Sequence, residues 1–298
     1  MCSVVAVDGM GGLGKTTVVR KVYKDGAVAT SFQFRTWITV SERYSIVALL
    51  KEIMGQFLEA AKRISGINTI PEHLEAPKET TDVPTLIDAL RNFLLDKRCL
   101  VVFDDVWDVE LWKYIKCAFP DQGNGSKILI TTRDEMVAAA WKRSLDNHVY
   151  KLQPDEAWDL FCNMAFRGDN KLCPSELEHL SLDIVGRCEG LPLAVVAIGS
   201  LLSTKPKFLS EWQRLYKNLG FHLQHNSQLK DVGRILFLSY HDLPYYLKPC
   251  FLYFGMFPED YSISHGRLVR LWAAEGFLEK GRTPEEVDEF AEEYLLEL

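Results

Sequence analysis

The stretch Gly9–Thr17 has the residue types and the spacing needed to hold a chain of phosphates. It reads GMGGLGKTT and fits the P-loop pattern G-x-x-x-x-G-K-[ST]. We expect positive φ angles at its four glycines, which would turn backbone N–H groups toward phosphate oxygens at the start of a helix. The alternative is a glycine-rich turn with a chance Lys-Thr pair. The residues expected to bind the nucleotide here are Gly9, Gly11, Gly12, Leu13, Gly14, Lys15, Thr16 and Thr17.

Two adjacent carboxylates, Asp104 and Asp105, follow the continuous apolar run Leu100–Phe103. In a P-loop site, Lys15 supplies a point charge to the outer phosphates, while the Thr16 hydroxyl and the Asp104 carboxylate are placed to hold Mg²⁺. Asp105 is the side chain that would orient or deprotonate an attacking water. An Asp pair that caps the junction between a strand and a turn is the alternative.

Arg133 ends a short β-prone run, residues 127–133. Its guanidinium could meet the terminal phosphate with paired N–H groups and so report whether that phosphate is present. An ordinary surface arginine is the alternative. Pro192 in the apolar stretch 190–194 can do no acid–base chemistry, and it fits the first turn of a helix whose surface could pack against a base. The seven histidines show no metal-ligand spacing, so we expect each to be a surface or core residue.

The surrounding pattern alternates β-prone and helical stretches. The runs 4–7, 32–40, 98–105 and 127–133 read as strands, and 149–152 could be a fifth. Helical spacing falls between them, at 18–23, 46–61 and 83–94. An apolar run without alternation suits a strand that is buried on both faces of a parallel sheet. The pattern therefore predicts a doubly wound α/β fold.

From Asp155 onward the periodicity is helical, with few strand signals to about Gly220. Further helical segments follow at 232–240, 265–277 and 284–298, the last with an apolar stripe on an acidic background. The chain of 298 residues is long enough for about two domains of ordinary size. It begins at the first strand and ends inside a helical pattern, so we expect a part of a longer protein.

Composition limits the classes of function. The net charge is −7, which argues against a broad nucleic-acid-binding surface. Seven scattered cysteines without a C-x-x-C pair indicate neither a disulfide framework nor a zinc site, and reduced thiols fit best. No signal peptide or membrane-spanning apolar run is found, so we expect a cytoplasmic protein without a transmembrane segment.

Eight motifs in their joint order carry a family resemblance. They are GMGGLGKTT (9–17), FRTWITVS (34–41), LVVFDDVW (100–107), GSKILITTR (125–133), LQPDEAWDLFCNMAF (152–166), GLPLA (190–194), KPCFLYFGMFPED (248–260) and LVRLWAAEGF (268–277). The chain resembles the NB-ARC region of plant nucleotide-binding leucine-rich-repeat immune receptors, which are P-loop NTPases of the STAND type. Trp107 and the stretch around Cys250 resemble the coiled-coil subclass. A bacterial or animal relative of the same switch class fits these two features less well.

The resemblance implies three parts: a P-loop domain at 1–152, a helical ARC1-like domain at 153–226 and an incomplete winged-helix ARC2-like domain at 227–298. It places the Arg133 strand between the P-loop strand and the Asp104 strand, and brings Pro192 near the adenine. It also implies coiled-coil and leucine-rich-repeat domains outside this chain. The family's Met-His-Asp motif, whose histidine meets the ADP phosphate, does not occur before Leu298.

The function that these features favour is an ADP/ATP switch of an immune receptor, off with ADP and on with ATP, with weak ATPase activity and self-association in the ATP state. The alternative is a processive ATPase that acts on nucleic acid or protein, against which the acidic balance and the Asp105-Val106-Trp107 sequence argue. A small-molecule or nucleotide kinase is a third possibility, for which the helical half offers no second polar pocket.

Overall fold

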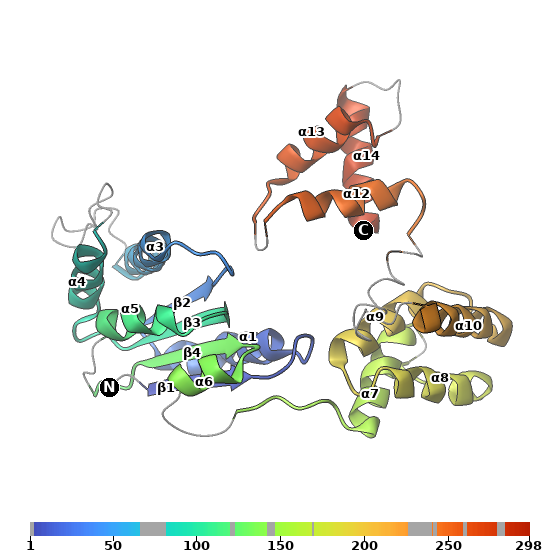
Figure 1. The fold of residues 1–298 in the computed structure, drawn as a ribbon, viewed down its shortest axis with the longest axis horizontal. Helices are drawn as coiled ribbons and strands as arrows, with labels where there is room; N and C mark the ends of the chain where they lie inside the picture. The colour runs from blue at the N-terminus through green and yellow to red at the C-terminus, as the bar shows by residue number, and fades with distance from the viewer. Residues whose placement is uncertain are drawn as a thin grey trace. The chain divides into compact units, whose positions relative to one another are not determined.

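A computed structural model describes most of the chain (Figure 1). The described residues are 3–65, 82–119, 123–141, 147–168, 170–225, 240, 243–258, 261–278 and 284–298. The chain divides into two compact units, residues 1–150 and residues 151–298. The domain boundary that we predict between 226 and 227 lies outside the described residues.

The first unit is built on a sheet of four parallel strands. These are β1 (Ser3–Asp8), β2 (Phe34–Thr39), β3 (Cys99–Val106) and β4 (Lys127–Thr132). Their order across the sheet is β1-β4-β3-β2, so the strand that leads to Arg133 lies between the other two site-bearing strands. The order expected from the family resemblance is thereby confirmed, as is the α/β fold class.

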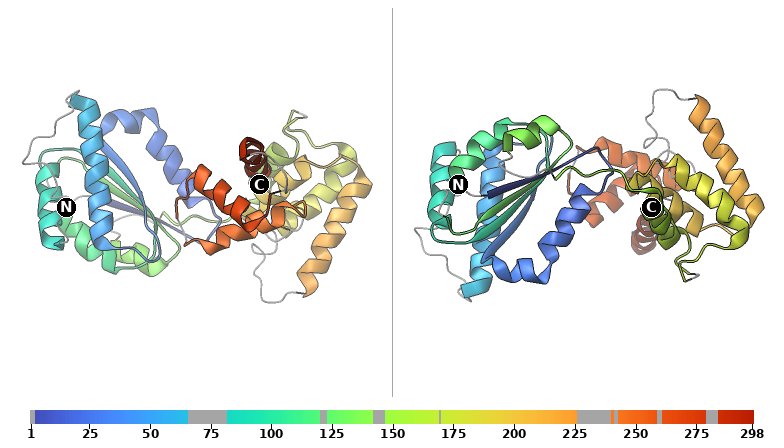
Figure 2. Two further views of the ribbon diagram at one scale, coloured as in Figure 1. Left: turned by 90° about the horizontal axis from the view of Figure 1, so that it is seen from above. Right: turned by 90° about the horizontal axis from the view of Figure 1, so that it is seen from below.

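Helices cover both faces of this sheet (Figure 2). The helices of the unit are α1 (Lys15–Lys24), α2 (Gly26–Ser31), α3 (Ile46–Ser65), α4 (Val83–Leu94), α5 (Glu110–Ala118) and α6 (Glu135–Trp141). Helices α3 to α6 pack on one face and form the large core, whereas Val19 of α1 packs against Val7 and Val102 on the other. Burial on both faces explains the unbroken apolar run in β3, where Leu100, Val101, Val102 and Phe103 are each at most 1% exposed.

The predicted fifth strand at 149–152 is wrong. The preceding residue, His148, makes one isolated parallel bridge with Asp8, and the segment itself adds one hydrogen bond to β1, from the Val149 amide to the Asp8 carbonyl at 2.8 Å. The amide of Leu152 donates instead to the Gly190 carbonyl at 2.8 Å. The chain therefore leaves the sheet after a single bridge, since the Leu152 amide is already committed to the second unit.

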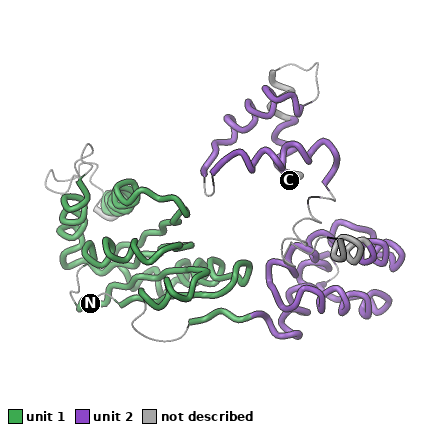
Figure 3. Tube along the Cα trace, in the orientation of Figure 1, with its two compact units in different colours: residues 1–150 green, residues 151–298 purple. Residues whose placement is uncertain are grey.

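The second unit is helical in its described part (Figure 3). Its elements are α7 (Pro154–Ala165), α8 (Ser175–Arg187), α9 (Pro192–Ser203), α10 (Leu209–His225), α12 (Leu247–Tyr253), the 3₁₀ turn η2 (Phe254–Met256), α13 (His265–Glu275) and α14 (Pro284–Glu297). No strand occurs between 151 and 298 among the residues described. The helical periodicity from Asp155 is confirmed, while the segment predicted at 232–240 lies outside the described residues except for Tyr240.

The last three helices share a core of their own. Trp272 and Cys250 are fully buried in it, and the predicted apolar stripe of α14 contributes Ala291 and Tyr294. Helix α13 ends at Glu275 and is capped by Gly276, which adopts a left-handed conformation with φ of 74°. Cys250 is therefore a core residue, as its apolar surroundings predict.

None of the helices in the described ranges is both long enough and apolar enough to span a bilayer.

The junction between Leu152 and Gly190 gives a test of the packing in the second unit. Gly190 has φ of +71°, and a Cβ atom there would lie 2.3 Å from the Leu152 carbonyl oxygen. We expect Gly190→Ala to lower the free energy of unfolding by about 1–3 kcal/mol, because it combines a strained φ with a backbone clash. The measurement is the urea midpoint of the whole chain.

Gly186→Ala is the matched control, since Gly186 lies in α8 with nothing within 4 Å of the added Cβ. Alanine is favoured in a helix, so this variant should be more stable by about 0.5–1 kcal/mol. Equal shifts of the urea midpoint in both variants would contradict the geometry at Gly190.

Candidate functional site

The loop between β1 and α1 carries the P-loop sequence, and its conformation depends on glycine. Gly9 has φ of +144°, and a Cβ atom there would lie 2.8 Å from the Val149 carbonyl oxygen, so no larger residue fits. Gly12 and Gly14 also adopt positive φ. Gly11 does not, so the prediction for that residue was wrong. Its position is open, with nothing within 4 Å of an added Cβ.

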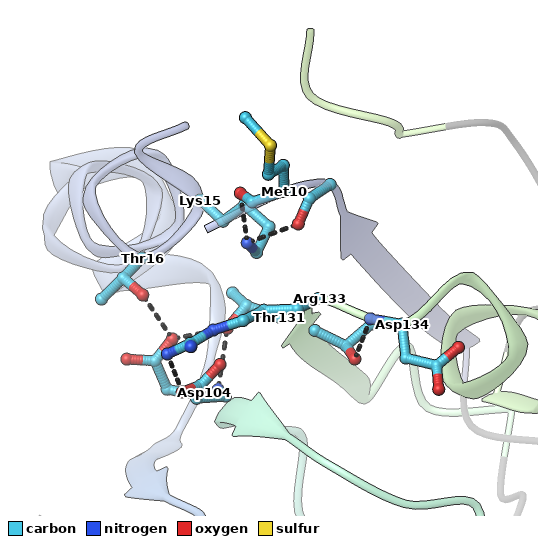
Figure 4. A network of polar contacts seen from close by, with 10 residues as sticks. Met10, Lys15, Thr16, Asp104, Thr131, Arg133 and Asp134 are labelled. Carbon is cyan, nitrogen blue, oxygen red and sulfur yellow. Dashed lines mark hydrogen bonds and ion pairs between the residues drawn. The ribbon is translucent and has the colours of Figure 1, made fainter. Parts of the chain in front are cut away.

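Lys15 is the first residue of α1 and is only 7% exposed. Its ammonium group donates to the carbonyl oxygens of Gly9, at 2.7 Å, and Met10, at 3.0 Å (Figure 4). The first turn of α1 contains no acidic residue. A cation and the positive end of a helix dipole therefore meet at the loop without a counter-charge from the helix itself, which favours an anionic ligand.

The surroundings of Lys15 leave its charge incompletely compensated. Burial lowers the pKa of the Lys15 ammonium below its ordinary value of 10.5, and the nearby Arg133 guanidinium acts in the same direction. The carboxylates of Asp105, Asp104 and Asp8 oppose this shift. Because the net direction is downward, a further anion beside Lys15 would stabilise its charged form.

Asp104 joins α1 to β3 and β4. It is 5% exposed, and its Oδ1 accepts hydrogen bonds from the Thr16 hydroxyl at 2.8 Å and from the Thr131 hydroxyl at 2.6 Å (Figure 4). A carboxylate and a hydroxyl at this spacing are hard oxygen donors, the kind that Mg²⁺ prefers. The residues present therefore fit a magnesium ion held by Thr16 and Asp104.

Thr131 is a site residue that the sequence patterns did not predict, and its hydroxyl makes two hydrogen bonds in the site. Besides donating to Asp104, its hydroxyl accepts the backbone N–H of Asp105 at 2.8 Å. The available signal was a pair of threonines that ends the otherwise apolar run Ile128–Ile130. Only the strand order, which puts β4 beside β3, gives that signal a meaning.

Asp105 and Arg133 are paired. A guanidinium nitrogen of Arg133 lies 2.8 Å from Asp105 Oδ2, and the guanidinium carbon lies 4.8 Å from the centre of the Trp107 ring. Asp105 adopts φ of 58°, and the register between β3 and β4 shifts between Phe103 and Val106. This irregularity allows two consecutive aspartates to serve different partners, Asp104 facing Thr16 and Asp105 facing Arg133.

The structure brings most of the predicted residues to the edge formed by the carboxyl ends of β1, β4 and β3. The loop, Lys15, Thr16, the two aspartates and Arg133 gather there. Thr17 lies exposed in the first turn of α1. Pro192 is the first residue of α9, in the other unit, so its expected contact with a base stays a prediction.

Two family models match parts of this chain, and the first match contains the residues of the P-loop site. Residues 1–171 match the model of the NB-ARC domain, and residues 256–298 match that of the disease resistance protein winged helix domain. The second match supports the predicted winged-helix fold at the C-terminal end of the chain.

Two curated plant proteins align with nearly all of the chain. The disease resistance protein RPM1 of Arabidopsis thaliana is 40% identical over 298 residues, which is 99% of this chain and 31% of that protein. A putative late blight resistance protein homolog of Solanum demissum is 36% identical over 293 residues, which is 96% of this chain and 20% of that protein. The chain thus spans about a third of the length of these relatives or less.

Among solved structures, the chain is similar to a signal transduction ATPase with numerous domains from Pyrococcus horikoshii that carries a tetratricopeptide-repeat sensor. The TM-score is 0.53 at 15% sequence identity, and the match covers 99% of this chain and 42% of that one. At this identity the likeness concerns the fold alone.

The hydroxyl of Thr131 can be tested without a ligand. We expect Thr131→Val to lower the free energy of unfolding by roughly 1.5–3 kcal/mol, because the buried Asp104 carboxylate loses a donor and the Asp105 amide loses its acceptor. Urea denaturation monitored by circular dichroism measures the change.

Thr131→Ser is the control for this variant. Serine keeps the hydroxyl and removes one methyl group, so the free energy of unfolding should fall by only about 0.8 kcal/mol. A valine variant as stable as the serine variant would contradict the role given to the hydroxyl.

Proposed function

This chain belongs to the NB-ARC family, and on that premise we propose that it binds ADP and ATP as the nucleotide-operated switch of a plant immune receptor. The observation that carries the proposal is the convergence of Lys15, Thr16 and Asp104. The Thr16 and Asp104 oxygens lie 2.8 Å apart, and Lys15 extends over a glycine loop at the head of α1. This arrangement suits a magnesium–nucleotide complex.

The parts of the site take separate roles in this proposal. Backbone N–H groups of the loop and the Lys15 ammonium bind the phosphates, while the Thr16 hydroxyl and Asp104 carboxylate hold Mg²⁺, which supplies positive charge to the outer phosphates. Asp105 orients the attacking water. Hydrolysis in this proposal is slow, and it resets the switch. Thr131 positions both aspartates through its two hydrogen bonds.

Arg133 gives the switch its two states. Its guanidinium pairs with Asp105 and lies over Trp107. A terminal phosphate could accept two parallel hydrogen bonds from this guanidinium, and it would compete with Asp105 for them. The chain would then respond differently to ATP and ADP, because only ATP supplies that partner.

We extend the proposal to the domains of the receptor and to their action on the switch. We assign residues 1–152 to the nucleotide-binding domain, 153–226 to a helical domain whose Pro192 touches the adenine, and 227–298 to a winged-helix domain. Coiled-coil and leucine-rich-repeat domains would act on the switch in the cytoplasm, and the ATP state would self-associate. The chain spans at most about a third of its curated relatives, which leaves room for such domains.

The first test is the nucleotide that the protein carries and the role of Lys15. Protein purified without added nucleotide and then denatured should release ADP in about equal molar amount, which chromatography identifies. Lys15→Ala should weaken ADP binding about a hundredfold in calorimetry, because hydrogen bonds to charged groups contribute roughly 1.5–3 kcal/mol each.

Lys21→Ala is the matched control, since Lys21 is an exposed lysine of the same helix. Its ADP affinity should equal that of the unaltered protein. Wild-type affinity in Lys15→Ala would overturn the site. Rapid turnover that rises with added nucleic acid would favour the processive ATPase instead.

Asp105 is tested by Asp105→Asn. Asparagine tolerates the φ of 58° at this position and keeps an oxygen for Arg133, but it lacks the negative charge. We expect single-turnover hydrolysis to fall by about 10²–10⁴-fold, with ATP retained. Unchanged turnover would show that Asp105 has no part in the chemistry, and loss of ATP binding would place it in binding.

A further inference from the structure

Three side chains with metal-binding atoms meet beside the end of β1, and they belong to separate parts of the sequence. They are Asp8, the last residue of β1, Glu135, the first residue of α6, and His148. Their ligand atoms all lie within 4.8 Å of one another. No two of them are close in sequence, so the motif spacing of the histidines could not reveal this group.

The backbone holds two of the three in place. Asp8 pairs with Thr132 of β4 and forms a parallel bridge with His148 on its other side. The Asp8 carbonyl also accepts the Val149 amide at 2.8 Å. The side chains of these two residues are also in contact, since His148 Nδ1 lies 2.6 Å from Asp8 Oδ2. Ligands fixed by secondary structure lose little freedom when they bind an ion.

The chemistry of the group selects the class of ion. Asp8 is 5% exposed, and a buried carboxylate beside a second carboxylate is stabilised by a cation placed between them. Imidazole nitrogen with carboxylate oxygen suits Zn²⁺ and related transition ions, whereas Mg²⁺ and Ca²⁺ prefer oxygen ligands alone.

The distances also fit such an ion. Bonds of about 2.0–2.1 Å in a tetrahedron place ligand atoms about 3.3 Å apart. The Asp8–His148 distance of 2.6 Å is that of a hydrogen bond, so these two atoms would move apart by about 0.7 Å around an ion, and the largest separation in the group is below 4.8 Å. A rotation of the half-buried His148 ring away from Asp8 and of the exposed Glu135 side chain toward it would bring all three into range.

The geometry points to a binding site for Zn²⁺ or a similar divalent transition ion, formed by Asp8, Glu135 and His148, with water as the fourth ligand. The ion would fasten the segment around His148 to β1 and to α6. The residue after His148 also limits the conformation of the P-loop, because the Val149 carbonyl oxygen lies 2.8 Å from where a Cβ atom of Gly9 would be. The site shares no residue with Thr16 and Asp104, so it is separate from the proposed magnesium site.

The experiment titrates the full chain, stripped with EDTA, with Co²⁺ and with Zn²⁺ in competition with a chromophoric chelator. We expect one equivalent of Co²⁺ to bind with the visible bands of a four-coordinate nitrogen and oxygen site, and Zn²⁺ to displace it. His148→Ala should weaken Zn²⁺ binding at least about a hundredfold, since even partners outside the ligand shell contribute 10–100-fold. Glu135→Gln, which changes an exposed side chain and leaves the core intact, should weaken it at least about tenfold.

Two controls keep the result specific. His179→Ala removes a histidine that also faces an aspartate, Asp183 at 3.6 Å, on the exposed surface of α8, and Zn²⁺ affinity should not change. Lys15→Ala should still bind one equivalent of Zn²⁺, so failure of the nucleotide proposal and failure of this one are distinguishable.

Three outcomes would overturn the site. The first is wild-type Zn²⁺ affinity in both His148→Ala and Glu135→Gln. The second is a near-ultraviolet thiolate band with Co²⁺, which would assign the ion to cysteines. The third is no Zn²⁺ binding in competition with the chelator, which would leave Asp8 and His148 as a hydrogen-bonded pair and nothing more.

Discussion

The carboxylate of Asp104 is 5% exposed, and a charge so deeply buried is stable only with hydrogen-bond donors around it. It receives two hydroxyls, one from Thr16 on α1 and one from Thr131 on β4. The Thr131 donor requires β4 to lie beside β3, and the Thr16 donor requires a glycine loop that turns the chain from β1 directly into α1. The strand order, the loop and the helix start are thus tied to one buried charge.

The second aspartate is held more weakly, which suits a switch. The side chains of Arg133 and Asp105 are 50% and 22% exposed, and ion pairs with this access to water contribute about 0–1 kcal/mol. The Trp107 ring adds a contact to the guanidinium of comparable size at an exposed site. Arg133 is therefore positioned without being fixed, and a phosphate with paired hydrogen bonds can displace Asp105 from it.

Much of the fold follows from local patterns in the sequence. Residues 100–103 form an unbroken apolar run because β3 is buried on both faces, and the glycine spacing marks the loop before Lys15. The sheet order came from family resemblance, since no periodicity states which strands are neighbours. The contacts of Thr131 and His148 are not predicted by the sequence for the same reason, because each side chain contacts a residue from a distant part of the chain.

The wrong predictions have local physical causes. Residues 149–152 have the composition of a strand, but one bridge is all that the chain can make before the Leu152 amide bonds to Gly190. The glycine motif predicts a positive φ at Gly11. In the structure, Gly9 and two other glycines of the loop adopt positive φ and Gly11 does not. In both cases the residue pattern is present, but the backbone conformation depends on neighbouring residues outside the pattern. The contact between Gly9 and the Val149 carbonyl shows the same dependence, since the tightest position of the phosphate loop is set by a segment about 140 residues further along the chain.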